Sequence, residues 1–121
     1  MLHKHLSTLS TFLAGDHTHL AEVLHPKNGD PELGYSLAHA FLETGESSLA
    51  HTLAQDELYL VTAGEGRIYI NEEGLDIQTG SIVLVPKGQA QWVENTGAGR
   101  LSFYCIVSPP WSEEGEQIKP G

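Results

Sequence analysis

The sequence predicts a single all-β domain, an antiparallel sandwich or barrel built from short strands. Short apolar runs recur along the chain, separated by turns that contain glycine, proline or asparagine. No convincing helical periodicity follows residue 20. A length of 121 residues is enough for one domain with a hydrophobic core of its own.

We expect residues 1–19 to form an N-terminal arm, helical or extended. Leucines between Leu2 and Leu13 are spaced for one or two amphipathic helical turns, which would end near Gly15. The following segment, HLAEVL, predicts a strand that stops before Pro26, because proline has no amide hydrogen to donate to a sheet.

The next two strands are predicted in YSLAHAFLE and LAHTL. Side chains alternate between the two faces of a strand. In YSLAHAFLE we expect the face with Leu37, His39 and Phe41 to point inward. In LAHTL, the alternation places His51 and Leu53 on one face.

Further strands are predicted in ELYLVTA, RIYI, LDIQ, SIVLVP, QAQWVEN and RLSFYCIV. Between RIYI and LDIQ, the segment NEEG has the composition of a hairpin loop. The barrel is therefore expected over residues 20–107. Residues 108–121 form an acidic tail that is broken by prolines, and we expect Trp111 to pack back on the barrel.

Composition excludes several classes of function. The formal net charge of -10 argues against nucleic acid and against anionic membranes as partners. No apolar run has the length needed to span a bilayer, and the first residues do not resemble a signal peptide. The single cysteine, Cys105, cannot form a disulfide within the chain, which fits a reducing compartment. We therefore expect a cytoplasmic protein.

Two stretches framed by glycines carry polar residues at fixed spacings. The fixed positions of the first stretch are Gly45, His51, Glu57 and Gly64. Those of the second stretch are Gly80, Pro86, Gly88, Gln91 and Asn95. These spacings resemble the paired motifs of the cupin superfamily. The resemblance covers roughly the middle of the chain.

The resemblance implies a double-stranded β-helix, or jelly-roll barrel, as the fold. It also suggests one of the small single-domain cupins of the mannose-6-phosphate isomerase-like type. Members of the superfamily usually hold a divalent metal ion with two histidines, a glutamate and a third histidine. This chain keeps His51 and Glu57, but Leu53 stands at the second histidine position and Gln91 at the third.

The metal motif is therefore degenerate. An imidazole, a carboxylate and an amide oxygen form a harder ligand set than three imidazoles do, so the ion would be Fe, Mn, Ni or Zn, with the first three favoured. His39 is the candidate for the missing second histidine, if its strand neighbours the motif strand and its side chain points inward.

Structural explanations stay open beside the metal site. His51 and Glu57 could form a buried hydrogen-bonded pair, since a buried carboxylate needs some partner. Gln91 could be a structural amide, and His39 a core or interface histidine. Cys105 is expected to be an inert core thiol. Tyr59 shares the face of Glu57, and both are candidate groups for proton transfer.

Two functions follow from the resemblance. As an enzyme, the protein would use a metal held by His51, Glu57 and Gln91 to act on a small oxygen-rich molecule, as an isomerase, an epimerase or a dioxygenase. As a binding protein, it would hold a small ligand in the same cavity without metal and without turnover. Small cupins commonly pair, so a homodimer is expected, with the HLAEVL strand as a candidate for exchange between protomers.

Overall fold

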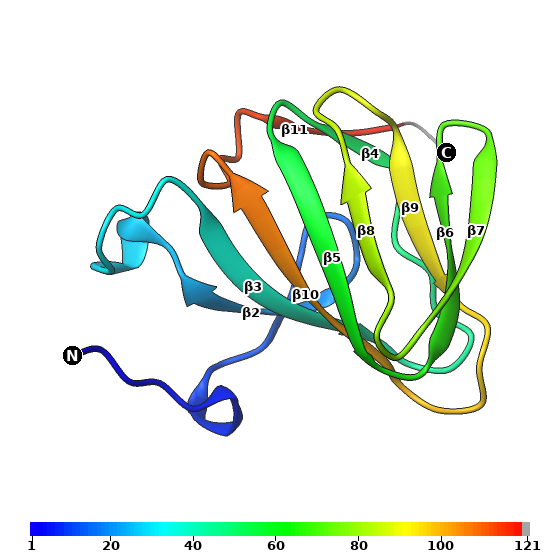
Figure 1. Ribbon diagram of the computed structural model, residues 1–121, viewed down its shortest axis with the longest axis horizontal. Helices are drawn as coiled ribbons and strands as arrows, with labels where there is room; N and C mark the ends of the chain where they lie inside the picture. Colours follow the sequence, from blue (N-terminus) through cyan, green and yellow to red (C-terminus); the bar gives the residue numbers. More distant parts are fainter. Residues whose placement is uncertain (120–121) are drawn as a thin grey trace.

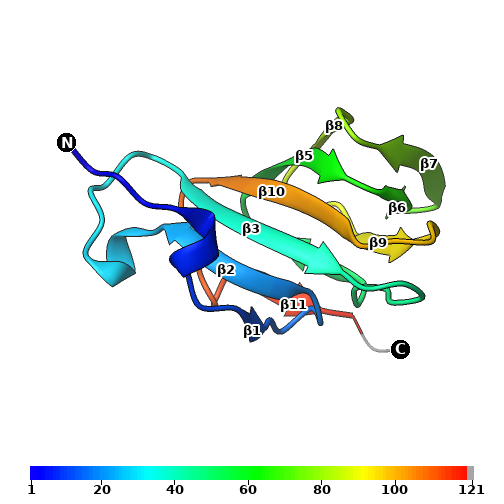
Figure 2. The ribbon, with the colours of Figure 1, turned by 90° about the horizontal axis from the view of Figure 1, so that it is seen from below.

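The computed structural model describes residues 1–119 and has the predicted all-β architecture, with two antiparallel sheets that face each other (Figures 1 and 2). Two short 3₁₀ turns, η1 (Leu6–Thr8) and η2 (Pro26–Asn28), are the helical elements of this range. The strands are β1 (Phe12–Leu13), β2 (His19–Leu24), β3 (Ser36–Leu42), β4 (His51–Leu53), β5 (Asp56–Ala63), β6 (Glu65–Ile70), β7 (Glu73–Gln78), β8 (Ile82–Val85), β9 (Gln91–Asn95), β10 (Leu101–Ser108) and β11 (Glu116–Ile118).

The six-stranded sheet has the order β1-β2-β3-β10-β5-β8, and the five-stranded sheet has the order β11-β4-β9-β6-β7. From β8 onward, each strand belongs to the sheet opposite that of the strand before it, so the chain crosses repeatedly between the layers. This double-sheet arrangement confirms the predicted jelly-roll barrel.

The core lies between the sheets because the strands alternate buried and exposed side chains. In β10, for example, Leu101, Phe103, Cys105 and Val107 are buried, and the residues between them are partly exposed. The central cluster contains residues of both sheets: Ala40, Leu42, Tyr59, Val61, Ile68, Ile77, Val83, Val85, Val93, Leu101, Phe103 and Cys105. The alternation that the sequence shows is therefore the alternation between core and surface.

The two ends of the chain frame the barrel. The N-terminal arm contains only the turn η1 and the short strand β1, rather than an amphipathic helix. The C-terminal tail contributes β11, which pairs with β4. The backbone amide of Trp111 donates to Ser36 Oγ over 2.9 Å, which confirms that Trp111 packs on the barrel. The last two residues of the predicted tail, 120–121, lie outside the described residues.

Candidate functional site

A cavity of about 150 Å³ lies inside the barrel, and residues of the N-terminal arm and the C-terminal tail line part of it. Most of its wall is apolar, with side chains such as Leu20, Ala40 and Phe103. The polar groups that face it are those of Asp16, His51, Glu57, Tyr59 and Glu116, with a few others. The cavity therefore combines an apolar interior with a small group of titratable side chains.

His51 is held with one ring nitrogen free to act as a ligand. The residue begins β4, is buried and is paired with Gln91 of β9. Its Nδ1 lies 2.8 Å from the carbonyl oxygen of Leu49. Because a carbonyl oxygen only accepts, Nδ1 carries the proton and donates. In the neutral ring Nε2 is then the acceptor, which is the arrangement usual for metal-binding histidines.

Glu57 lies on the inner face of β5, and one of its oxygens is unsatisfied. Its side chain is buried, and Oε1 has no hydrogen-bond partner. The pKa of Glu57 is raised from 4.5 to about 7, mainly by burial and also by the charge of Asp16, although the charge of His51 lowers it. Hydrogen bonds with Gln91 and Cys105 lower the pKa but do not offset the burial. The carboxyl group therefore exchanges a proton near neutral pH.

Gln91 is engaged by protein groups. The Tyr59 hydroxyl donates to Gln91 Oε1 inside the core. Burial, followed by the negative charge of Glu57, raises the pKa of Tyr59 well above its usual range. The hydroxyl is thus neutral and acts as a donor. Burial likewise raises the pKa of the Cys105 thiol, which fits the expected inert cysteine.

The metal-ligand set that the motif implies fits this site only in part. Leu53 offers no donor atom, and the amide oxygen of Gln91 already accepts from Tyr59. Ligation by Gln91 would require that hydrogen bond to be shared or broken. His51 and the unsatisfied oxygen of Glu57 are the two motif positions that remain suited to a metal ion.

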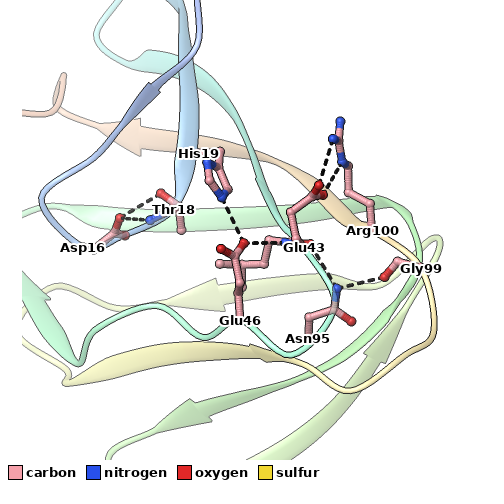
Figure 3. Close-up of polar contacts among 9 residues, drawn as sticks. Asp16, Thr18, His19, Glu43, Glu46, Asn95, Gly99 and Arg100 are labelled. Atoms are coloured by element: carbon pink, nitrogen blue, oxygen red, sulfur yellow. Dashed lines mark hydrogen bonds and ion pairs between the residues drawn. The ribbon is translucent and has the colours of Figure 1, made fainter.

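Asp16, from the loop after β1, is a site residue that the sequence does not reveal. Its Oδ1 accepts from both the backbone amide and the hydroxyl of Thr18, at 3.1 and 2.7 Å (Figure 3). Its Oδ2 lies 3.8 Å from His51 Nε2. The Asp16 carbonyl accepts from the Leu49 amide over 2.7 Å, which attaches the loop to the segment before β4.

Glu116, from β11, is the second such residue. Its register partner is Leu53, the position where the motif expects the second histidine. Residues paired in this way project from the same face of a sheet. Burial raises the pKa of Glu116, and the charge of Asp16 raises it further, whereas His51 and a hydrogen bond from Trp111 lower it. Asp16, His51 and Glu116 each offer a ligand atom, and these atoms all lie within 4.8 Å of one another.

Neither residue stands at a motif position, which explains why the motif spacing does not find them. Asp16 precedes Thr18 by two residues, a spacing that signals a local turn but says nothing about His51. Glu116 lies in the tail, and only the short run EQI hints at a strand. Their contact with His51 depends on tertiary structure.

The expectation that His39 points into the barrel is wrong. Its neighbours in β3, Ala38 and Ala40, line the cavity, so the alternation of the strand turns His39 to the outer face. There its ring packs edge-on against Tyr104, with the ring centroids 4.9 Å apart. Burial, followed by the charge of Arg100, lowers the pKa of His39. Because Ala38 and Ala40 are small, they leave space for the cavity on the inner face of β3.

Comparison with known proteins identifies a family. The Cupin domain matches residues 38–107 of the chain. An uncharacterised protein of Methanocaldococcus jannaschii is 27% identical over 111 residues, which make up 91% of this chain and 88% of that protein.

Solved structures share the fold at low identity. A predicted oxalate decarboxylase from Thermotoga maritima superposes with a TM-score of 0.79 and 20% identity, covering 89% of this chain and 99% of that one. The nucleoside dehydratase Pac13 from Streptomyces gives a TM-score of 0.78 and 16% identity, with 98% and 91% covered. A Cupin 2 conserved barrel domain protein from Salinispora arenicola gives 0.77 and 16%, with 94% and 91% covered. The likeness to these structures shows the fold.

Proposed function

Because this chain belongs to the cupin family, whose domain matches residues 38–107, we propose that it holds a divalent metal ion in the barrel cavity. We further propose that it binds a small oxygen-rich molecule, such as a sugar or an organic acid, beside that ion. The ion is one of Fe, Mn, Ni or Zn, the metals that suit a mixture of imidazole and carboxylate ligands.

The observation that carries the proposal is the state of His51. Its Nδ1 is fixed by the Leu49 carbonyl, which directs the remaining nitrogen toward carboxylates in the cavity. The buried Oε1 of Glu57 lacks a partner in the same cavity. An unpartnered buried carboxylate is costly, and a cation nearby would offset that cost.

The size of the cavity supports a small ligand. A volume of about 150 Å³ is comparable to engineered cavities of about 150 Å³ that take up benzene. Among the structural neighbours, Pac13 is a nucleoside dehydratase that was solved with uridine, and another is a predicted oxalate decarboxylase. These names are consistent with an oxygen-rich ligand.

The proposed chemistry is proton transfer assisted by a metal ion, as in an isomerase or an epimerase. A divalent ion supplies polarisation of a carbonyl group, or activation of O2 if the reaction is a dioxygenation. Glu57, with a pKa of about 7, suits the acid–base role because its proton is readily gained or lost near neutral pH. Tyr59 suits a positioning role, since its neutral hydroxyl holds Gln91.

A metal-free binding protein is the second candidate. Leu53 offers no ligand, the oxygen of Gln91 is occupied by Tyr59, and most of the cavity wall is apolar. A protein that lost its metal site would keep such a cavity for a small molecule. In this case Glu57 would remain protonated when a ligand is bound.

We also propose a homodimer in a reducing compartment such as the cytoplasm. Four aliphatic side chains form a contiguous outer patch, because Leu58 pairs with Leu84 and Leu60 with Ile82. Ile82 is 67% exposed and Leu84 60% exposed, on the edge strand β8. Such a patch favours burial against a second copy. The candidate exchange strand HLAEVL, in contrast, lies between β1 and β3 within the protomer.

No helix among residues 1–119 is long and apolar enough to cross a membrane. The single cysteine is a free thiol, and this supports the proposed reducing compartment. Assignment to the mannose-6-phosphate isomerase-like type stays a prediction of the sequence.

The metal content of the purified protein tests the proposed function. We expect near-stoichiometric metal in the wild type, loss of it in His51→Gln, and no change in the matched control His39→Ala, which alters a histidine on the outer face. Glutamine is close to histidine in size and polarity, so the fold should survive, and circular dichroism checks this. Metal-free wild-type protein would refute the proposal in favour of the metal-free binding protein. Equal metal in His51→Gln would show that the ion is not bound at His51 and would refute the proposed site.

A further inference from the structure

Three segments far apart in the sequence bring ligand atoms together beside the cavity. Asp16 comes from the loop after β1, His51 from β4 and Glu116 from β11. Their ligand atoms lie within 4.8 Å of one another, and all three residues line the cavity. A single ion could contact all three after small side-chain movements.

Two of these side chains are oriented by contacts on their far side. Thr18 holds Oδ1 of Asp16 through its amide and its hydroxyl, and leaves Oδ2 directed at His51. The Leu49 carbonyl holds Nδ1 of His51 and leaves Nε2 directed at Asp16. Supporting hydrogen bonds of this kind fix the orientation of metal ligands in known sites. The free atoms of the two residues are 3.8 Å apart, which is too long for a direct hydrogen bond.

Glu116 lies beside Leu53, the position where the motif has its second histidine. The strand ladder pairs it with Leu53, and both project from the same face. A carboxylate from β11 can therefore reach the region that a histidine at position 53 would have served. The C-terminal tail, outside both motifs, supplies a donor that the motif no longer has.

Glu57 provides an independent indication that a cation belongs here. It is only 7% exposed, and its Oε1 has no partner within the described chain. It faces the same cavity and senses the charges of both His51 and Asp16. Lys27, the cation that also lines the cavity, is bound to Glu22 at 2.8 Å and lies 5.0 Å from the Trp111 ring centroid. The other histidine of the cavity, His25, has both ring nitrogens engaged, by the Trp111 carbonyl and the Lys27 amide. His51 is therefore the imidazole that remains for Asp16, Glu57 and Glu116.

We propose that Asp16, His51 and Glu116 are the protein ligands of a divalent metal ion, with the unpartnered oxygen of Glu57 facing that ion. This assignment rests on the proposed function, in which the cavity holds a metal, and it replaces the ligand set implied by the motif. Two carboxylates and one imidazole form a hard ligand set whose two negative charges neutralise a divalent ion. Such a set favours Mn²⁺ or Fe²⁺ more than a histidine-rich set would.

Calorimetric titration of the metal-stripped protein with Mn²⁺, repeated with Zn²⁺, tests the ligand assignment. The variants Asp16→Asn and Glu116→Gln remove one ligand charge each while preserving shape. Asp76→Asn and Glu114→Gln are matched controls, because they change exposed carboxylates outside the cavity. We expect each ligand variant to weaken Mn²⁺ binding by at least about tenfold, and the controls to bind like the wild type. Thermal unfolding of each apo variant confirms that the fold is intact.

Glu57→Gln separates the failure of this assignment from the failure of the proposed function. If the wild type binds metal, Glu57→Gln abolishes binding, and Asp16→Asn and Glu116→Gln bind normally, the motif positions hold the ion. The assignment is then wrong while the proposed function stands. Wild-type affinity in either Asp16→Asn or Glu116→Gln also overturns the assignment. Absence of binding of both metals to the wild type overturns the assignment and the proposed function together.

Discussion

The motif residues at the two ends of β5 and β9 differ in how completely their polar side chains are hydrogen-bonded. At the cavity end lie Glu57 and Gln91, and at the opposite end lie Gly64 and Asn95, at or just beyond the ends of the same two strands. Asn95 is fully partnered: its amide nitrogen donates to the Gly99 carbonyl (Figure 3) and to the Leu42 carbonyl, and its Oδ1 accepts from the Gly97 amide. Glu57, in contrast, keeps an oxygen without a partner.

This difference separates the motif into a structural part and a chemical part. The far end retains the residues of the motif because its backbone geometry requires them. At the cavity end, Leu53 and Gln91 stand at two positions where the motif has histidine, and the carboxylates of Asp16 and Glu116 lie nearby. The same two stretches can therefore specify the fold and still leave the chemistry to be determined by the arm and the tail.

The largest effect on stability is expected for Gly64→Ala, at the end of β5 that lies away from the cavity. Gly64 has φ +90, and a Cβ there would lie 2.4 Å from the Arg100 carbonyl oxygen. Backbone strain and overlap with backbone together should lower the free energy of unfolding by about 4 kcal/mol, as measured by urea denaturation. The matched control is Gly80→Ala, at φ +91 with nothing within 4 Å, where strain alone costs about 1 kcal/mol. Equal losses would show that the close approach to Arg100 is unimportant.

A pH-dependent effect is expected for Glu57 at the cavity end. Its pKa is raised from 4.5 to about 7, so the folded protein keeps a proton that the unfolded chain releases. With a chelator present to keep the protein free of metal, the free energy of unfolding of the wild type should therefore fall as the pH rises from the lower to the higher of these pKa values. The total decrease should be about 3 kcal/mol. Glu57→Gln carries no ionisable group and should lack this decline. Parallel stability curves for the two proteins would contradict the burial of an ionisable carboxyl here.

A smaller effect is expected for Asn95→Ala. The substitution leaves two carbonyls and one amide without their partner, which should cost about 2 kcal/mol in urea denaturation. Asn28→Ala, at an exposed asparagine in η2, serves as control and should change stability by less than about 0.5 kcal/mol. If Asn95→Ala loses no more free energy of unfolding than the control does, the hydrogen bonds of Asn95 contribute little to stability.

The smallest effect on stability is expected at the outer patch, where assembly changes instead. By light scattering, we expect the wild type to be a dimer. We expect the double variant that combines Ile82→Lys and Leu84→Lys to be a folded monomer. Leu75→Lys, at a side chain that is 52% exposed on β7 of the other sheet, should remain dimeric. A monomeric wild type, or a double variant that remains dimeric, would exclude this patch as the interface.

The fold could be predicted because its determinants are local. Alternating residues define the strands, and glycines such as Gly64 mark turns that need an unusual backbone conformation. His51 and Glu57 were identified at the cavity because they lie on strands whose inner face follows from the motif spacing. The sequence alone does not give the direction of His39, because the alternation in β3 is compatible with either face, and the face of Ala38 and Ala40 is the one that points inward.

The rest of the site depends on contacts that local patterns do not encode. Asp16 reaches His51 only because its loop is hydrogen-bonded to Leu49. Glu116 reaches the cavity only because the tail adds a strand to β4. Similarly, the hydrogen bond from Tyr59 to Gln91 forms only because β5 and β9, which belong to different sheets, lie close together. Each of these contacts joins residues that are distant in sequence.

Anomalous diffraction from crystals of the protein grown with Mn²⁺ would decide which residues bind the ion, because it locates the ion. We expect one peak at about 2.0 to 2.2 Å from His51 Nε2 and within ligand distance of carboxylate oxygens of Asp16 and Glu116. A peak bound by Glu57 and Gln91 without Asp16 and Glu116, or a cavity without a peak, would contradict this expectation.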